Sequence, residues 1–84
     1  MIRFYTKDYC PYCVRAKYLL DSIEADYEEI NITRRPDIFQ EISAKSRMRT
    51  LPQIFVWEVC LGGYDDIALL HQKDELRGLL GLDG

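Results

Sequence analysis

The sequence predicts an α/β domain, with a four-stranded mixed sheet flanked by helices in the order β-α-β-α-β-β-α. Segments rich in β-branched and aromatic side chains alternate with segments of helical periodicity through the first half of the chain. A strand, a helix and a strand joined by short links imply a parallel pair with a right-handed crossover. Two further strands follow with so tight a link that they must form an antiparallel hairpin.

Size and composition narrow the class of protein. The 84 residues suffice for a single domain over residues 1–84, and 48% of them are apolar. Three cysteines, an odd number, exclude a full disulfide framework, and a net charge of −3 argues against nucleic acid as a partner. The sequence shows neither a membrane-spanning stretch nor a signal-peptide layout. We therefore expect a cytoplasmic protein without a membrane partner.

The first half of the chain supplies two strands and a helix. Residues 2–6 and 27–32 predict the strands, and residues 11–24 predict the helix between them. Pro11 suits the first helical turn, where its missing N–H costs nothing. Apolar side chains recur at spacings of three and four and form one inward stripe: Cys13, Ala16, Leu20 and Ile23.

The second half supplies a helix, the hairpin and a last helix. A helix is expected from Pro36 through about Lys45, followed by hairpin strands at residues 53–57 and 59–61, which Gly62-Gly63 ends. Asp65-Asp66 is expected to cap the last helix. That helix is predicted to run on through Asp74. The inward side chains expected of these two helices are Ile38, Phe39 and Ile42, then Ile67, Leu70, Leu76, Leu79 and Leu80.

The chemistry is expected at a pair of cysteines, Cys10 and Cys13, that opens the first helix. Unpaired N–H groups and the helix dipole stabilise a thiolate at Cys10, and Lys7 adds positive charge. Cys10 is therefore predicted to bring its sulfur to the surface as the attacking thiolate. Cys13 lies one turn inward on the apolar stripe, so its pKa should be higher and it should resolve mixed disulfides on Cys10. The pattern predicts thiol–disulfide exchange.

Other uses of a Cys-x-x-Cys pair are less consistent with this sequence. A zinc site would need Cys60 and His71 as further ligands, brought together by coincidence of folding, so no metal is expected. A structural disulfide fits poorly in a reducing cytosol. Cys60 is expected to be a small buried or half-buried apolar residue on the fourth strand, and His71 a surface or boundary residue.

Three segments of the chain form a recognisable set of motifs: Thr6-Lys7-x-x-Cys10-Pro11-Tyr12-Cys13, Thr50-Leu51-Pro52-Gln53-Ile54-Phe55 and Gly62-Gly63-Tyr64-Asp65-Asp66. Taken in this order they resemble the dithiol glutaredoxins, the short bacterial type most closely, and the match covers the whole chain. The resemblance implies a thioredoxin-like fold, glutathione as reductant and co-substrate, and disulfide or glutathionylated proteins as substrates, ribonucleotide reductase being compatible. It also implies a cis bond between Leu51 and Pro52.

The resemblance further implies a groove for the two carboxylates and the ammonium group of glutathione. The Asp65 amide would bind the γ-glutamyl carboxylate at a helix N-terminus, and Asp66 would pair with the ammonium group. On local grounds a plain helix N-cap explains both residues equally well. The backbone of Leu51 would pair with the cysteinyl part. The implied glutathione-binding residues are Lys7, Tyr12, Thr50, Leu51, Pro52, Tyr64, Asp65 and Asp66.

The glycyl carboxylate of glutathione would bind Lys7 together with a residue near the second helix. Three residues are candidates for that second position: Arg34, Arg35 and Gln40.

Two positions depart from the family pattern. Trp57-Glu58 stands at the hairpin turn, where a type I′ turn would need positive φ at both residues, so another turn type is expected. Trp57 should then be exposed, either as a partner contact or as a tolerated surface aromatic. Arg47 stands close to the place where a glycine commonly ends the second helix.

Two further functions remain open from the sequence. One is an iron–sulfur cluster held between two protomers by Cys10 thiolates and two glutathiones, which Pro11 disfavours. The other is a redoxin reduced by thioredoxin reductase, whose members usually lack a Gly-Gly-x-Asp-Asp segment. We expect a monomer, because the sequence shows no obvious apolar patch.

Overall fold

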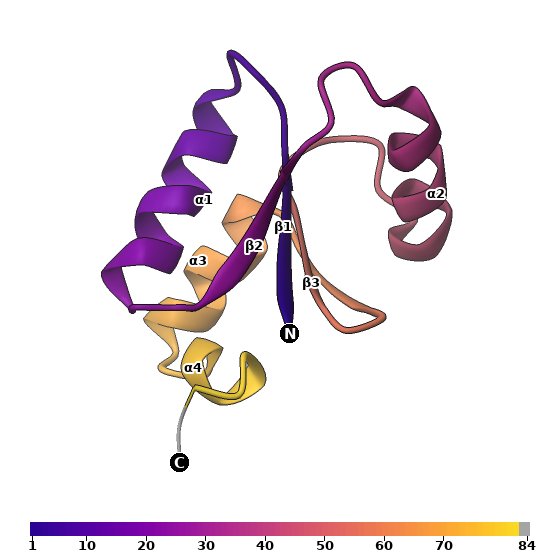
Figure 1. Ribbon diagram of the computed structural model, residues 1–84. Coiled ribbons are helices and arrows are strands. Elements are labelled where there is room, and N and C mark those ends of the chain that lie inside the picture. The colour runs from indigo at the N-terminus through magenta and orange to yellow at the C-terminus, as the bar shows by residue number, and fades with distance from the viewer. Residues whose placement is uncertain (83–84) are drawn as a thin grey trace.

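The computed structural model describes residues 1–82. Its strands form one sheet in the order β2-β1-β3-β4, in which β1 pairs parallel with β2 and antiparallel with β3, and β3 and β4 form the hairpin. The elements are β1 Ile2–Thr6, α1 Pro11–Ser22, β2 Tyr27–Asn31, α2 Pro36–Ser46, β3 Gln53–Val56, β4 Val59–Gly62, α3 Tyr64–Gln72 and α4 Leu76–Leu79. This arrangement confirms the predicted thioredoxin-like fold (Figure 1).

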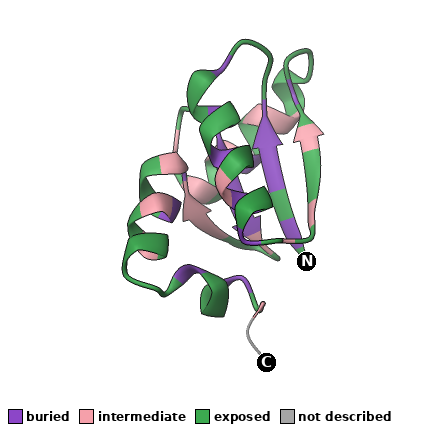
Figure 2. Cartoon of the chain, turned by 90° about the vertical axis from the view of Figure 1, so that its left-hand side faces the viewer, coloured by how far each residue is buried: buried purple, intermediate pink, exposed green. Residues whose placement is uncertain are grey.

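The helices lie in two layers with the sheet between them. Helices α1, α3 and α4 lie on one side of the sheet, and α2 lies alone on the other (Figure 1). The central strand β1 is buried on both faces, since Phe4 packs into the core under α1 and α3 while Tyr5 packs into the smaller core under α2. Figure 2 shows this buried strand behind the exposed outer face of α1.

The stripe predicted for α1 is buried. Ala16 and Leu20 have no exposed surface, and Cys13 and Ile23 retain 3% and 7%. The helix ends at Ser22, two residues earlier than predicted, because Glu24 takes a left-handed φ of 57° that a helix cannot continue through.

The prediction of one continuous last helix is wrong. Helix α3 ends at Gln72, and Asp74 takes a left-handed φ of 62° before the short helix α4 begins at Leu76. The break turns the chain so that Leu76 and Leu80 become buried against the same core as Ile67 of α3. The apolar spacing seen in the sequence is therefore divided between two helices.

The two departures from the family pattern have clear backbone consequences. Trp57 takes a φ of 55° and is 71% exposed, and Glu58 is not left-handed, so the turn is not type I′, as expected. Arg47 occupies the C-terminal position of α2 with a left-handed φ of 63°, where glycine would be unstrained. Lys45 pairs with Glu58 at 2.8 Å and ties the end of α2 to the hairpin turn.

Candidate active site

Cys10 is the N-cap residue of α1, and its sulfur makes two contacts that matter for chemistry. Cys10 Sγ accepts a hydrogen bond from the Cys13 backbone N–H at 3.2 Å and donates one to the Leu51 carbonyl at 3.8 Å. An N–H directed at the sulfur stabilises its thiolate form. The residue is 7% exposed, less than the surface position expected from the sequence, because Leu51 covers it from the opposite loop.

Cys13 is buried, as predicted, and more deeply than Cys10. It is 3% exposed and lies in the core under α1 and α3. Burial raises the pKa of the Cys13 thiol above its ordinary value, and the neighbouring Cys10 raises it further, whereas hydrogen bonds from Thr6 and Lys7 act in the opposite direction. Both cysteines are free thiols, so the structure represents the reduced dithiol form.

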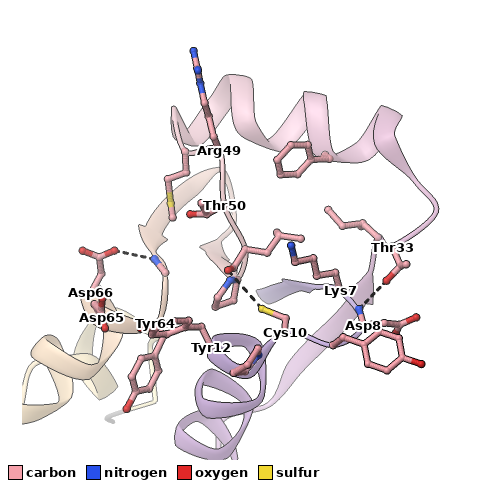
Figure 3. Close-up of a pocket in the computed structure, with 18 of the residues that line it drawn as sticks. Lys7, Asp8, Cys10, Tyr12, Thr33, Arg49, Thr50, Tyr64, Asp65 and Asp66 are labelled. Carbon is pink, nitrogen blue, oxygen red and sulfur yellow. Dashed lines mark hydrogen bonds between the residues drawn. The ribbon is translucent and has the colours of Figure 1, made fainter.

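A groove of about 850 Å³ opens beside Cys10 and is lined from five parts of the chain. Its walls are the loop before α1 with the start of that helix, the end of β2, the first turn of α2, the segment before β3 and the start of α3 (Figure 3). The bond between Leu51 and Pro52 is cis, as the resemblance implied. The groove contains every predicted site residue except Cys13: Lys7, Cys10, Tyr12, Thr50, Leu51, Pro52, Tyr64, Asp65 and Asp66.

The start of α3 is built differently from the sequence expectation. The N-cap residue is Gly63, not Asp65 or Asp66, and the Asp66 carboxylate accepts the Gly63 N–H at 2.9 Å from inside the first turn (Figure 3). Gly62 has a φ of 114°, and a Cβ there would lie 2.3 Å from Asp66 Oδ2. The first N–H groups of a helix lack partners within it, so this end of α3 offers donors to the groove.

Two tyrosines close the groove between α1 and α3. The rings of Tyr12 and Tyr64 lie 6.2 Å apart between centroids, and the Arg15 guanidinium stacks over the Tyr12 ring at 5.0 Å. Tyr12 is 49% exposed, so it presents an aromatic surface beside Cys10. The role in glutathione binding that the resemblance implied for Tyr12 stays a prediction.

The positive charge of the groove does not come from the candidates named near the second helix. Arg34, Arg35 and Gln40 are not among the groove residues, and Arg35 forms an ion pair with Asp37 at 2.9 Å. Lys7 points into the groove, and Arg49 lines it but extends away from its centre (Figure 3). Arg49 directly precedes the Thr50 motif, which was the signal that could have identified it.

Sequence reasoning also missed a hydrogen-bonded group between two loops. The Asp8 N–H donates to Thr33 Oγ1 at 2.8 Å, the Asn31 side chain donates to the Asp8 carboxylate at 2.8 Å, and the Thr33 hydroxyl donates to Asn31 Oδ1 at 2.7 Å. These bonds join the Cys10 loop to the end of β2. Because β1 and β2 are parallel, their carboxyl ends share one edge of the sheet, and that pairing could have predicted the contact.

The remaining candidates lie outside the cysteine chemistry. Cys60 is half-buried on β4, burial raises its pKa, and its sulfur lies 3.9 Å from Met48 Sδ. His71 is exposed on α3. Within residues 1–82, no group of three or more histidine, cysteine or acidic residues could hold a metal ion. The helices of that same stretch include none long and apolar enough to cross a membrane.

Comparison with known proteins gives consistent matches. The family model described as Glutaredoxin matches residues 2–60. A glutaredoxin of Pseudomonas aeruginosa is 40% identical over 76 residues, which is 90% of each chain. The solution structure of glutaredoxin from Brucella melitensis has a TM-score of 0.85 and 38% identity, covering 96% of this chain and 88% of that one. A buckwheat glutaredoxin–glutathione complex has a TM-score of 0.86 and 29% identity, covering 95% and 76%.

Proposed function

Because the chain belongs to the glutaredoxin family of glutathione-dependent thiol–disulfide oxidoreductases, we propose that Cys10 and Cys13 are its catalytic dithiol. The observation that carries the assignment is the Cys10 sulfur at the N-cap of α1, which accepts the Cys13 N–H at 3.2 Å beside an open groove. A helix N-terminus stabilises the thiolate that attacks, while burial keeps Cys13 as a thiol until it is needed.

The proposed reaction conserves thiols at each step. The Cys10 thiolate attacks one sulfur of a substrate disulfide, the S–S bond breaks, and the leaving thiolate takes up a proton. With a protein disulfide, Cys13 then attacks the Cys10 sulfur, releases the second substrate thiol and forms a Cys10–Cys13 disulfide. Two glutathione molecules return that disulfide to the dithiol and become glutathione disulfide. With a glutathionylated substrate, Cys10 takes up the glutathione, and a second glutathione releases it.

We infer that the groove binds glutathione, since a buckwheat glutaredoxin of similar fold forms a complex with glutathione. The free N–H groups at the start of α3, near Tyr64 and Asp65, suit the γ-glutamyl carboxylate, and Asp66 suits the ammonium group. The Leu51 backbone suits the cysteinyl part. Lys7, which points into the groove, suits the glycyl carboxylate, and Arg49 adds long-range attraction from the rim (Figure 3).

The proposal also covers the protein substrates, the oligomeric state and the location of the enzyme. Its partners would be disulfide-bonded and glutathionylated proteins, with ribonucleotide reductase among the candidates. The protein would act as a single-domain monomer in the cytoplasm. Cys60 and its neighbour Met48 take no part in the proposed reaction.

The test is reduction of a small glutathione mixed disulfide, coupled to glutathione reductase and NADPH. We expect Cys10→Ser to abolish turnover with every substrate, because Cys13 is buried with a raised pKa and Cys60 lies outside the groove. We expect Cys13→Ser to retain turnover of the glutathione mixed disulfide and to lose reduction of a protein disulfide. Turnover in Cys10→Ser with an intact fold would refute the assignment.

A further inference from the structure

Gln53 is a fully buried polar side chain directly behind the groove. It has no exposed surface, and it lies at the start of β3, two residues after Leu51. Its Nε2 group donates to the Thr50 carbonyl at 3.2 Å and contacts Ser43 Oγ on α2 at 3.3 Å. The contact with Thr50 fixes which end of the amide faces that residue, since a backbone carbonyl can only accept.

The Gln53 amide is only partly satisfied by hydrogen bonds. Its Oε1 atom is buried without any hydrogen-bond partner among residues 1–82. A buried polar atom without a partner costs free energy, so an apolar side chain of similar volume would avoid that cost. An apolar side chain could make neither the bond to the Thr50 carbonyl nor the contact with Ser43, and only the first of these involves a residue that lines the groove.

That bond controls a peptide group at the edge of the groove. The Thr50 carbonyl and the Leu51 N–H belong to one planar peptide unit, and this unit is trans, since the cis bond follows at Leu51–Pro52. In a trans peptide the carbonyl and the N–H point in opposite directions. Holding the carbonyl against Gln53 therefore turns the Leu51 N–H away from that buried side chain, and Leu51 itself lines the groove.

We propose that Gln53 is a positioning residue that aims the Leu51 N–H at the cysteinyl backbone of bound glutathione. The Leu51 N–H makes no hydrogen bond within residues 1–82, so it is available to a ligand. The inference rests on the proposed function, because it assumes that glutathione occupies the groove. It adds a specificity determinant that contacts neither the substrate nor the reacting sulfur.

The experiment compares Gln53→Met with Ser43→Ala in the coupled glutathione assay at 25 °C. Met keeps the volume of Gln53 but has no donor. Ser43→Ala removes the other contact of the amide and leaves its bond to Thr50. We expect Gln53→Met to raise the KM for a glutathione mixed disulfide about tenfold, the value of one well-placed hydrogen bond, with kcat within twofold of wild type. We expect Ser43→Ala to leave KM within twofold.

Two controls separate positioning from structural damage. The rate of Cys10 alkylation by iodoacetamide should be equal in wild type and Gln53→Met, because that reagent does not use the Leu51 N–H. Gln53→Glu should restore a KM near that of wild type at pH 6, since burial keeps the new carboxyl protonated and able to donate to Thr50. This variant also serves if Gln53→Met does not fold.

The outcomes are distinct. Equal KM values for Gln53→Met and Ser43→Ala, or a Gln53→Glu variant as impaired as Gln53→Met, overturn the role of Gln53 while the proposed function stands. Absence of glutathione-dependent turnover in wild type overturns the proposed function itself.

Discussion

Helices α1 and α3 both begin at the groove, and their N-termini are capped in opposite ways. At α1 the cap is the Cys10 sulfur, which accepts the Cys13 N–H and is itself the reactive atom. At α3 the N-cap is Gly63, which has no side chain, and the Asp66 carboxylate binds the Gly63 N–H from within the first turn. The first arrangement uses the helix terminus for bond chemistry, and the second leaves the terminus open to a ligand.

The two helix ends also differ in the acidic residues of their first turns. The first turn of α1 contains no acidic residue, whereas the first turn of α3 contains Asp65 and Asp66. An acidic side chain in the first turn of α1 would oppose negative charge on the capping sulfur, and that turn has none. A γ-glutamyl group carries a carboxylate, which free N–H groups can bind, and an ammonium, which acidic side chains can pair with. One helix end therefore suits a single negative sulfur, and the other suits a zwitterion.

The largest effect on this comparison is expected from Gly62→Ala. An added Cβ would lie 2.3 Å from Asp66 Oδ2, and an alanine at a φ of 114° is strained. We expect the free energy of unfolding to fall by about 2–3 kcal/mol, which for a domain of this size lowers Tm by roughly 10–20 °C. Because Asp66 must move, the KM for a glutathione mixed disulfide should rise, while Cys10 alkylation should not change. Thermal denaturation and the coupled assay measure these effects.

Gly81→Ala is the matched control. Gly81 also has a positive φ, of 74°, but an added Cβ meets nothing within 4 Å. The control therefore carries the backbone strain without displacing Asp66, and its KM should equal that of wild type. Equal KM values for the two alanine variants would show that the start of α3 does not depend on the position of Asp66.

A smaller effect is expected from Asp66, where capping and charge can be separated. Asp66→Ala loses both, and we expect it to lower the free energy of unfolding by about 1 kcal/mol. Asp66→Asn keeps an oxygen that can accept the Gly63 N–H, so its loss should be a few tenths of a kcal/mol. Both variants lose the charge and should raise the KM for a glutathione mixed disulfide on the order of threefold, the range for an exposed ion pair.

Denaturant unfolding and the coupled assay together test this separation. A KM of Asp66→Asn equal to that of wild type would show that Asp66 acts as a cap and does not pair with the ammonium group.

The two helix ends also differ in how far the sequence could predict them. The α1 end could be predicted in detail, because Cys10, Pro11 and the apolar stripe through Cys13 are local signals of one helix and its cap. The α3 end was predicted with the wrong cap, since Gly63 offers no side chain and Asp65-Asp66 satisfies the same local rule. The extended backbone of Gly63, directly before the helix begins at Tyr64, distinguishes the two alternatives.

Residues that meet through tertiary packing were harder to predict. Arg49 lines the groove because it precedes Thr50 in the segment between α2 and β3, and Thr33 lines it because the parallel strands β1 and β2 end at one edge of the sheet. The break at Asp74 was missed because aspartate, unlike glycine, gives no strong signal for a left-handed φ. Gln53 was part of a recognised motif, but its role depends on a carbonyl direction that no sequence pattern encodes.

The smallest expected effect is the pH dependence of the thiols at the α1 end. At neutral pH we expect Cys10 and Cys13 to differ in reactivity, with no effect on the stability of the fold. Burial raises the pKa of Cys13 above its ordinary value of 9.0, so in Cys10→Ser the remaining active-site thiol should be alkylated by iodoacetamide only with a midpoint above pH 9. Burial also raises the pKa of Cys60, whose alkylation would overlap with that of Cys13. The variant measured is therefore Cys10→Ser/Cys60→Ala.

The same shift predicts a small change of stability at high pH. Because the folded-state pKa of Cys13 is raised, the unfolded chain releases this proton first as pH increases. The stabilisation from the buried thiol is therefore complete below about pH 9 and decreases as pH rises through the folded-state pKa. Urea unfolding of Cys13→Ala against wild type between pH 8 and pH 10 measures this decrease, since the variant lacks it. An alkylation midpoint of Cys13 at or below pH 9 would mean that the α1 end activates both sulfurs alike, which would remove the distinction between an attacking and a resolving thiol.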